Sequence, residues 1–139
     1  MKAFLEIKAL GKSYWNAEIL KDINLTAVRG EVLALIGPTG SGKTTLLRLV
    51  NLLETPSLGR ILIEGRDVTS LSERDKLPVR RRMAMVFQKP VMFKAKVAEN
   101  VSFGLKMRGR DDRGKVMDAL AAVGLSGYEN RDANTLSGG

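Results

Sequence analysis

The residues with the clearest chemistry are Gly37 to Thr44, which match the pattern G-x-x-x-x-G-K-[ST]. An apolar run, residues 32–36, precedes them and residues 45–50 follow, so we expect a buried strand, a glycine-rich turn and a helix start. In such a turn successive backbone N–H groups point at one anion, and the positive end of the helix adds to the attraction. Lys43 is placed to reach terminal phosphates, and the Thr44 hydroxyl to ligate Mg²⁺. The sequence therefore predicts a loop that binds a nucleotide, rather than a plain connecting turn.

The predicted contact set of this loop extends one residue beyond the motif, to Thr45. Lys43 is also a candidate catalytic residue, because phosphoryl transfer depends on positioning and on stabilisation of charge. The nucleotide-binding residues expected here are Gly37, Pro38, Thr39, Gly40, Ser41, Gly42, Lys43, Thr44 and Thr45.

Gln88 is a second candidate, because it closes another apolar run, residues 83–87, that predicts a strand buried on both faces. Open α/β sheets bind ligands beyond the carboxyl ends of their strands. There the Gln88 amide could ligate Mg²⁺ or orient a water, although a glutamine that ends a strand is usually only solvated.

Two further features have both a functional and a structural interpretation. The sequence Leu136-Ser137-Gly138-Gly139 is a phosphate-like turn that could hold an anion at a helix start. The aromatic pair Tyr14-Trp15 lies in an early loop, where one ring could stack on adenine or could simply pack against a small sheet. Neither tetrapeptide nor pair is specific by itself.

The composition excludes several kinds of chemistry. The 139 residues include no cysteine, which excludes disulfides, cysteine-ligated zinc and thiol catalysis. They also include no histidine, so any general base must be a carboxylate or lie elsewhere. The sequence shows no apolar run near the roughly 18–20 residues that span a bilayer. The default compartment is the cytoplasm.

The net charge of +8 raises the question of an anionic partner. Basic residues cluster at 80–82 and again between Arg108 and Lys115. Such clusters suit nucleic acid or an anionic membrane surface. No aromatic residues alternate with the basic residues inside either cluster to stack on bases, so we favour a phosphate site with solvated helix faces, and no nucleic acid partner.

The rest of the chain alternates short strands and helices. Residues 4–8 and 19–28 alternate apolar and polar side chains, and 60–65 is another short strand. A capped short helix is expected to begin within residues 70–74 and to be broken by Pro78. Longer helices are expected over 43–53, 97–107 and 110–123, the last with Val116, Leu120 and Val123 on one face.

Taken together and in this order, these features resemble the ATP-binding subunit of ATP-binding cassette (ABC) transporters. The resemblance covers residues 4–139, with Gly37–Thr44 as the Walker A loop, Gln88 as the Q-loop glutamine and Leu136–Gly139 as the family signature. Tyr14 falls where the family carries its adenine-stacking aromatic, and Trp15 beside it leaves that assignment open.

The resemblance implies an α/β fold, with a P-loop NTPase core, an N-terminal antiparallel β part and a partial α-helical subdomain. We expect the incomplete nucleotide-binding core over residues 1–88 and the truncated helical subdomain with the signature over 89–139.

The resemblance also implies a mechanism that uses ATP and Mg²⁺, the metal held by Thr44 and Gln88. Two such subunits would pair head to tail, with Ser137, Gly138 and Gly139 of one copy against the γ-phosphate held by Lys43 of the other. Residues 91–93 would contact a membrane-spanning permease, the alternative being that they pack inside the helical part. We expect a peripheral subunit on the cytoplasmic face of the cell membrane, in a complex with a solute-binding protein.

One departure from the family is that the sequence stops on the last glycine of the signature. The family continues with a second acidic strand (Walker B), a catalytic glutamate and a switch histidine. We therefore expect a fragment of a longer ATPase, inactive or nearly so by itself, since phosphoryl transfer to water needs a group that orients the water.

Three functional hypotheses remain. The first is an importer subunit, possible substrates being oxyanions such as phosphate, tungstate or molybdate. The second is a soluble ABC-type ATPase that acts on nucleic acid or ribosomes. The third is a nucleotide-binding module without enzymatic activity.

Overall fold

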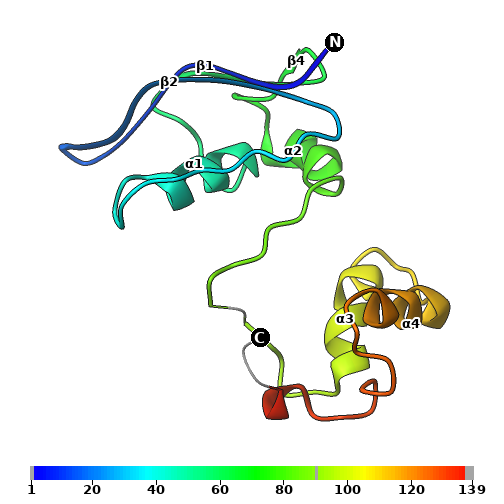
Figure 1. Ribbon diagram of the computed structural model, residues 1–139. Coiled ribbons are helices and arrows are strands. Elements are labelled where there is room, and N and C mark those ends of the chain that lie inside the picture. Colours follow the sequence, from blue (N-terminus) through cyan, green and yellow to red (C-terminus); the bar gives the residue numbers. More distant parts are fainter. Residues whose placement is uncertain (1, 90, 137–139) are drawn as a thin grey trace. The chain divides into compact units, whose positions relative to one another are not determined.

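The computed structural model describes residues 2–89 and 91–136 (Figure 1). Contacts divide the chain into two compact units, Met1–Met85 and Val86–Gly139. The predicted nucleotide-binding loop lies in the first unit and Gln88 in the second. Each unit is therefore described by itself.

The first unit is built on a four-stranded antiparallel sheet with the order β2-β1-β3-β4. The strands are β1 (Ala3–Tyr14), β2 (Ala17–Val28), β3 (Leu58–Ile63) and β4 (Arg66–Asp67). The hairpin of β1 and β2 runs from the pair Ala3↔Val28 to the pair Tyr14↔Ala17 at its tip. The predicted N-terminal antiparallel part is present, with strands longer than the alternation indicated.

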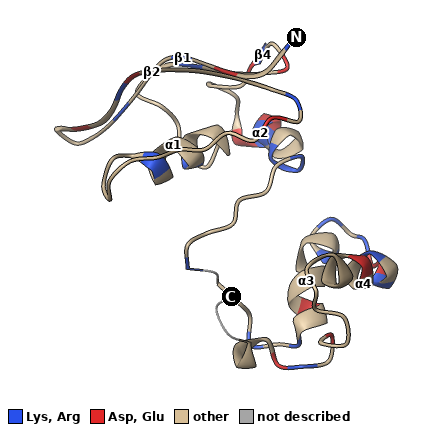
Figure 2. Cartoon of the chain, in the orientation of Figure 1, with Lys and Arg blue, Asp and Glu red and all other residues tan. Residues whose placement is uncertain are grey.

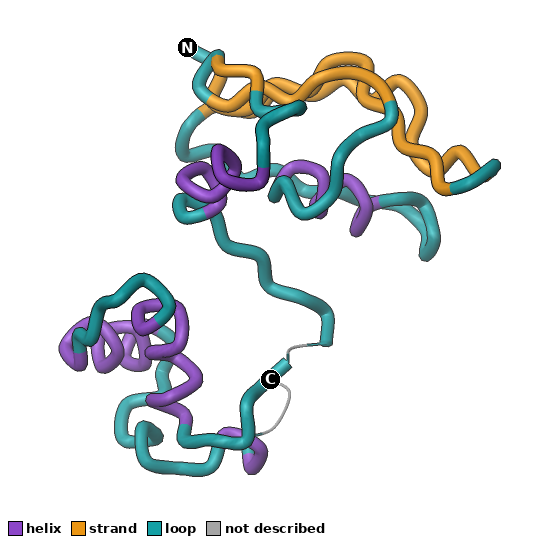
Figure 3. Tube along the Cα trace, turned by 180° about the vertical axis from the view of Figure 1, so that it is seen from behind, coloured by secondary structure: helices purple, strands orange, loops and turns teal. Residues whose placement is uncertain are grey.

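Two helices lie on one side of this sheet, α1 (Lys43–Val50) and α2 (Glu73–Arg80) (Figures 1 and 3). Leu10 of β1, Leu49 of α1 and Ile61 of β3 are completely buried between the two layers. The core also contains Ile7, Leu20, Leu46, Leu52, Ile63 and Val68. This packing fixes α1, and with it the loop that precedes it, against the hairpin.

The predicted capped start of α2 is confirmed, and the structure identifies Ser72 as the cap, since its hydroxyl accepts a hydrogen bond from the Asp75 N–H at 3.2 Å. The predicted break at Pro78 is wrong, since α2 continues to Arg80. Arg80 anchors this last turn by donating from Nε and Nη2 to the Leu52 carbonyl, at 3.0 and 2.6 Å. The tertiary contact outweighs the backbone hydrogen bond that proline removes.

The prediction of two buried parallel strands, residues 32–36 and 83–87, is wrong for this structure. Both segments are irregular, and Val32, Ile36 and Val86 are 94 to 96% exposed. A strand requires a neighbour for its backbone N–H and C=O groups. Within residues 2–89 and 91–136, the sheet pairs only β1 to β4, so these apolar segments find no neighbouring strand.

The second unit contains α3 (Val97–Lys106), α4 (Arg113–Ala122) and the 3₁₀ turn η1 (Ala133–Thr135). Its core is formed by Val97, Val116, Leu120 and Ala133. Val116 and Leu120 are buried as predicted, whereas α4 ends before Val123, which is 69% exposed. The bridge between Lys96 and Asp132 ties the start of α3 to the end of the unit.

The basic residues are largely interspersed with acidic ones, as the mixed colours on α2 and α4 show (Figure 2). Arg80 pairs with Glu73 at 2.7 Å, and Arg82 pairs with Glu64 at 2.8 Å. Two of the three arginines at 80–82 thus have a structural role. In the described part of the chain, no helix is long and apolar enough to cross a membrane.

Candidate nucleotide-binding site

The loop before α1 depends on two glycines in the left-handed region, Gly40 with φ 82° and Gly42 with φ 86°. That conformation costs a residue with a Cβ about 1–2 kcal/mol. Gly42 also lacks space, because an added Cβ would lie 2.7 Å from Leu20 Cδ2 and 3.1 Å from the Ile19 carbonyl oxygen. The loop is therefore folded tightly against β2, which fixes where α1 starts.

The N-terminus of α1 is open to an anion. Gly42 caps it without a side-chain hydrogen bond, and the first turn holds no acidic residue. The first intrahelical bond runs from the Leu46 N–H to the Gly42 carbonyl at 2.9 Å. The preceding N–H groups of a helix have no intrahelical acceptor and carry its positive partial charge. A phosphate oxygen is a natural ligand for such a group.

The Lys43 side chain folds back into the loop that precedes it. Its ammonium donates to the carbonyls of Gly37 and Pro38, both at 2.7 Å, and to the Ser41 hydroxyl at 3.3 Å. A full positive charge is thereby held inside the loop. Negatively charged phosphate oxygens accept stronger hydrogen bonds from an ammonium than neutral carbonyl and hydroxyl oxygens do. The Lys43 ammonium can therefore leave these acceptors for a phosphate.

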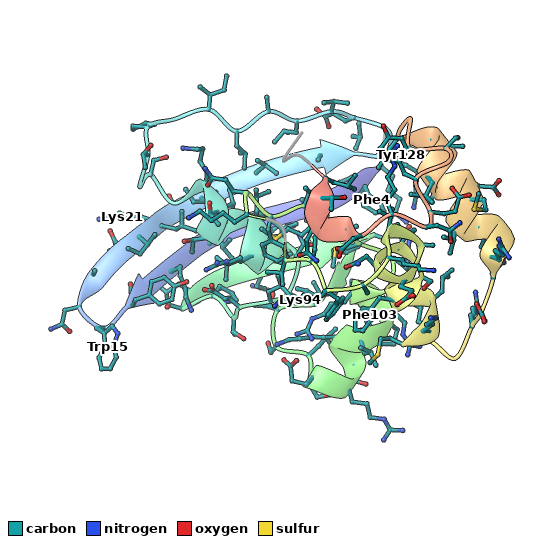
Figure 4. The ribbon with its side chains drawn as sticks, turned by 90° about the horizontal axis from the view of Figure 1, so that it is seen from below. Phe4, Trp15, Lys21, Lys94, Phe103 and Tyr128 are labelled. Atoms are coloured by element: carbon teal, nitrogen blue, oxygen red, sulfur yellow. The ribbon has the colours of Figure 1, made fainter. Side chains whose placement is uncertain are left out.

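Tyr14, at the end of β1, is tied to the segment that follows α1. Its hydroxyl donates to Glu54 Oε2. This hydrogen bond raises the pKa of Tyr14, as do burial and the Glu54 charge, while Thr45 and Arg48 oppose the rise. Trp15 instead lies at the hairpin tip, fully exposed and with φ 54° (Figure 4). Of the two rings, only Tyr14 is linked to the loop-bearing helix.

The other predicted site residues lie outside the unit that contains this loop or outside the described residues. Gln88 is exposed and belongs to the second unit, so its catalytic and metal-binding roles stay predictions. Ser137, Gly138 and Gly139 lie outside the described residues. Within residues 2–89 and 91–136, no group of three or more acidic residues could form a metal site by itself. Coordination of Mg²⁺ by Thr44 therefore also stays a prediction.

Two residues near Tyr14 were missed by sequence reasoning. Glu54 holds the Tyr14 hydroxyl, and the Lys12 ammonium lies 4.8 Å from the centroid of the Tyr14 ring. No motif marks either residue, because Glu54 is 40 positions from Tyr14 and reaches it only through the packing of α1 on the sheet. The only available signal was an acidic residue just after the predicted helix.

Comparisons with known proteins support the resemblance to ATP-binding subunits of ABC transporters. The family described as "ABC transporter" matches residues 20–139. The chain is 40% identical to a "Probable anion import ATP-binding protein" of Haloferax volcanii, covering 99% of this chain and 54% of that protein. It is 42% identical to the "Fe(3+) ions import ATP-binding protein FbpC" of Escherichia coli K12, covering 99% of this chain and 39% of that protein.

A solved structure with the same fold is the ATP-binding cassette MJ0796, described as dimeric, post-hydrolysis and bound to ADP and Pi. It aligns with a TM-score of 0.86 and 27% identity, over 96% of this chain and 63% of that chain. This match confirms the predicted α/β fold with its P-loop core. The chain spans about half the length of the curated relatives it matches. By its sequence and its fold, the chain belongs to the ABC transporter family.

Proposed function

We propose that the chain is the nucleotide-binding part of an ATP-binding subunit that couples ATP binding and hydrolysis to solute import. The observation that carries the proposal is the Lys43 ammonium, held inside a glycine-rich loop at the uncapped start of α1. A loop of this kind cradles the phosphates of a nucleotide, and the family membership specifies ATP.

In this proposal Lys43 neutralises the terminal phosphates, and the N–H groups of the loop and first helical turn bind their oxygens. Thr44 and Gln88 hold Mg²⁺, and Gln88 helps to orient the attacking water. Tyr14 stacks on the adenine ring. The signature residues Ser137, Gly138 and Gly139 complete the site of a second copy, head to tail. The dimeric relative bound to ADP and Pi supports this arrangement.

The partners follow from the same proposal. A subunit that drives import needs membrane-spanning permease subunits, and we place it peripherally on the cytoplasmic face of the membrane, with a solute-binding protein in the complex. Val91 is 92% exposed and Phe93 is 50% exposed, which suits a contact with a permease. Since one relative is named for anions and another for Fe(3+), the proposed oxyanion substrate rests on the first alone.

ATP hydrolysis is proposed for the protein at the length of its relatives. Residues 1–139 contain no histidine, and the 37–44 loop offers no carboxylate that could act as a base. The test is an ATPase assay on the long protein, on its Lys43→Ala variant and on residues 1–139 alone. We expect turnover only from the first. If residues 1–139 hydrolysed ATP and Lys43→Ala abolished that activity, the claim that residues 1–139 are inactive by themselves would be wrong. If the long protein did not hydrolyse ATP, the proposed ATPase activity would be wrong.

The alternative of a soluble ATPase acting on nucleic acid is tested separately. An importer subunit should co-purify with integral membrane proteins in detergent. A nucleic-acid ATPase should instead bind RNA with an affinity that falls steeply as salt concentration rises. The names of both relatives favour import.

A further inference from the structure

We propose that Glu54 is a positioning residue for the nucleotide base: it holds the Tyr14 ring in place and so couples the base site to the helix that binds the phosphates. The inference rests on the proposed function, in which Tyr14 stacks on adenine. It concerns a residue outside every motif of the sequence.

The contacts of Glu54 come from two directions. One carboxylate oxygen accepts the Tyr14 hydroxyl. The other lies 3.5 Å from Arg48 Nη1, on α1. Glu54 itself follows α1 by four residues and its side chain is only 21% exposed. One side chain thus joins the end of β1 to the C-terminal half of the helix whose N-terminus forms the phosphate site.

Two hydrogen bonds between Ser57 and the residues just before Tyr14 reinforce this joint. The Ser57 N–H donates to the Gly11 carbonyl at 2.9 Å, and the Ser13 N–H donates to the Ser57 hydroxyl at 3.1 Å. The end of β1 is therefore fastened along the 54–57 segment rather than projecting freely. Within this fastened region, the Glu54 hydrogen bond holds the hydroxyl of the Tyr14 side chain itself.

Lys12 makes a second contact with Tyr14, over the face of its ring. Its ammonium lies 4.8 Å from the ring centroid and donates to the Thr55 carbonyl at 2.8 Å. A cation over one face of an aromatic ring is attracted by its negative quadrupole. With Lys12 over one face and Glu54 at the hydroxyl, Tyr14 remains 37% exposed, and in this proposal the base stacks on the face opposite Lys12.

The inference predicts that loss of Glu54 weakens binding of the base and leaves binding of the phosphates unchanged. Stacking of a base on an aromatic ring contributes about 5- to 150-fold in affinity. If Glu54 only orients the ring, its removal lowers affinity for ATP by no more than this stacking contribution of about 5- to 150-fold. It leaves affinity for inorganic tripolyphosphate unchanged, since that ligand has no base.

The experiment measures the affinities of the purified protein for ATP and for tripolyphosphate by calorimetry. The variants are Tyr14→Ala, Tyr14→Phe, Glu54→Ala and the double variant Tyr14→Phe with Glu54→Ala. The matched control is Glu18→Ala, because Glu18 pairs with Lys21 on the exposed part of the hairpin. We expect Glu54→Ala and Tyr14→Phe each to weaken the binding of ATP but not of tripolyphosphate. The double variant should weaken ATP binding no further than either single variant.

Each outcome decides one claim. The deciding quantity is the affinity for ATP divided by the affinity for tripolyphosphate. If Tyr14→Ala leaves this ratio unchanged, base stacking on Tyr14 is wrong, and the role proposed for Glu54 is wrong as well. If Tyr14→Ala lowers the ratio and Glu54→Ala does not, the function stands and the role of Glu54 is wrong. Equal losses for both ligands in Glu54→Ala would show a merely structural role. Should Glu54→Ala not fold, Tyr14→Phe removes the same hydrogen bond and is judged in the same way.

Discussion

The packing of the phosphate loop against the hairpin makes a quantitative prediction for Gly42→Ala. Gly42 and Gly40 have nearly the same left-handed φ, 86° and 82°. An added Cβ meets Leu20 and Ile19 at Gly42, whereas at Gly40 nothing lies within 4 Å. Gly40→Ala is therefore a matched control that carries the backbone strain without the clash.

The magnitude follows from three contributions. Left-handed strain costs either variant about 1–2 kcal/mol. The smaller entropy of the unfolded chain returns about 0.4–1 kcal/mol to both. The clash with the buried Leu20 side chain adds about 1–3 kcal/mol to Gly42→Ala alone, as for an overpacked core. The first two contributions cancel in the comparison, so Gly42→Ala should be less stable than Gly40→Ala by about 1–3 kcal/mol.

The assay is urea unfolding followed by circular dichroism, from which the free energy of unfolding of each variant is extrapolated. Binding of ATP should weaken in the same order, because displacement of Gly42 moves the N–H groups of the first helical turn. Equal stabilities of the two variants, or a Gly42→Ala protein as stable as wild type, would refute the argument that the loop is packed on β2.

Two further predictions concern stability elsewhere in the chain. The hydrogen bond from Arg82, and the charges of Arg82 and Arg29, lower the pKa of Glu64 below its ordinary value of 4.5, with burial opposing them. This stabilisation is complete above that value and is lost as pH falls through the lowered pKa, so Glu64→Gln should flatten the acid side of a melting-temperature profile; an unchanged slope would contradict the pairing. Leu120→Ala, in the core of the second unit, should lower the free energy of unfolding by about 2–5 kcal/mol, whereas Val123→Ala should change it little; similar losses in urea titrations would contradict the burial difference.

The local features of the site could be predicted from sequence because they depend on neighbouring residues. The glycine pattern of 37–44 requires left-handed turns before a helix, and Gly40 and Gly42 adopt them. The stretch 70–74 predicts a capped helix start, and Ser72 provides the cap of α2. In both cases the physical cause lies within a few residues of the observed structure.

Long-range features could not be predicted in this way. The apolar runs 32–36 and 83–87 read as buried strands, but a strand depends on neighbours that the periodicity of one segment cannot supply. The Tyr14–Glu54 hydrogen bond likewise follows from the packing of α1 on the sheet. The missing N–H of Pro78 predicted a break in α2, but the hydrogen bonds from Arg80 to the Leu52 carbonyl hold the last turn of the helix.

The most direct test of the central claim, that the 37–44 loop is an ATP site, is a calorimetric titration of the protein with ATP and Mg²⁺. The account predicts one bound nucleotide per chain, with affinity at least about tenfold weaker in Lys43→Ala, since a charge-assisted contact contributes about 1.5–3 kcal/mol. The control Lys21→Ala removes an exposed lysine of β2 and should bind as wild type does. Undiminished ATP binding by a folded Lys43→Ala protein would contradict the claim.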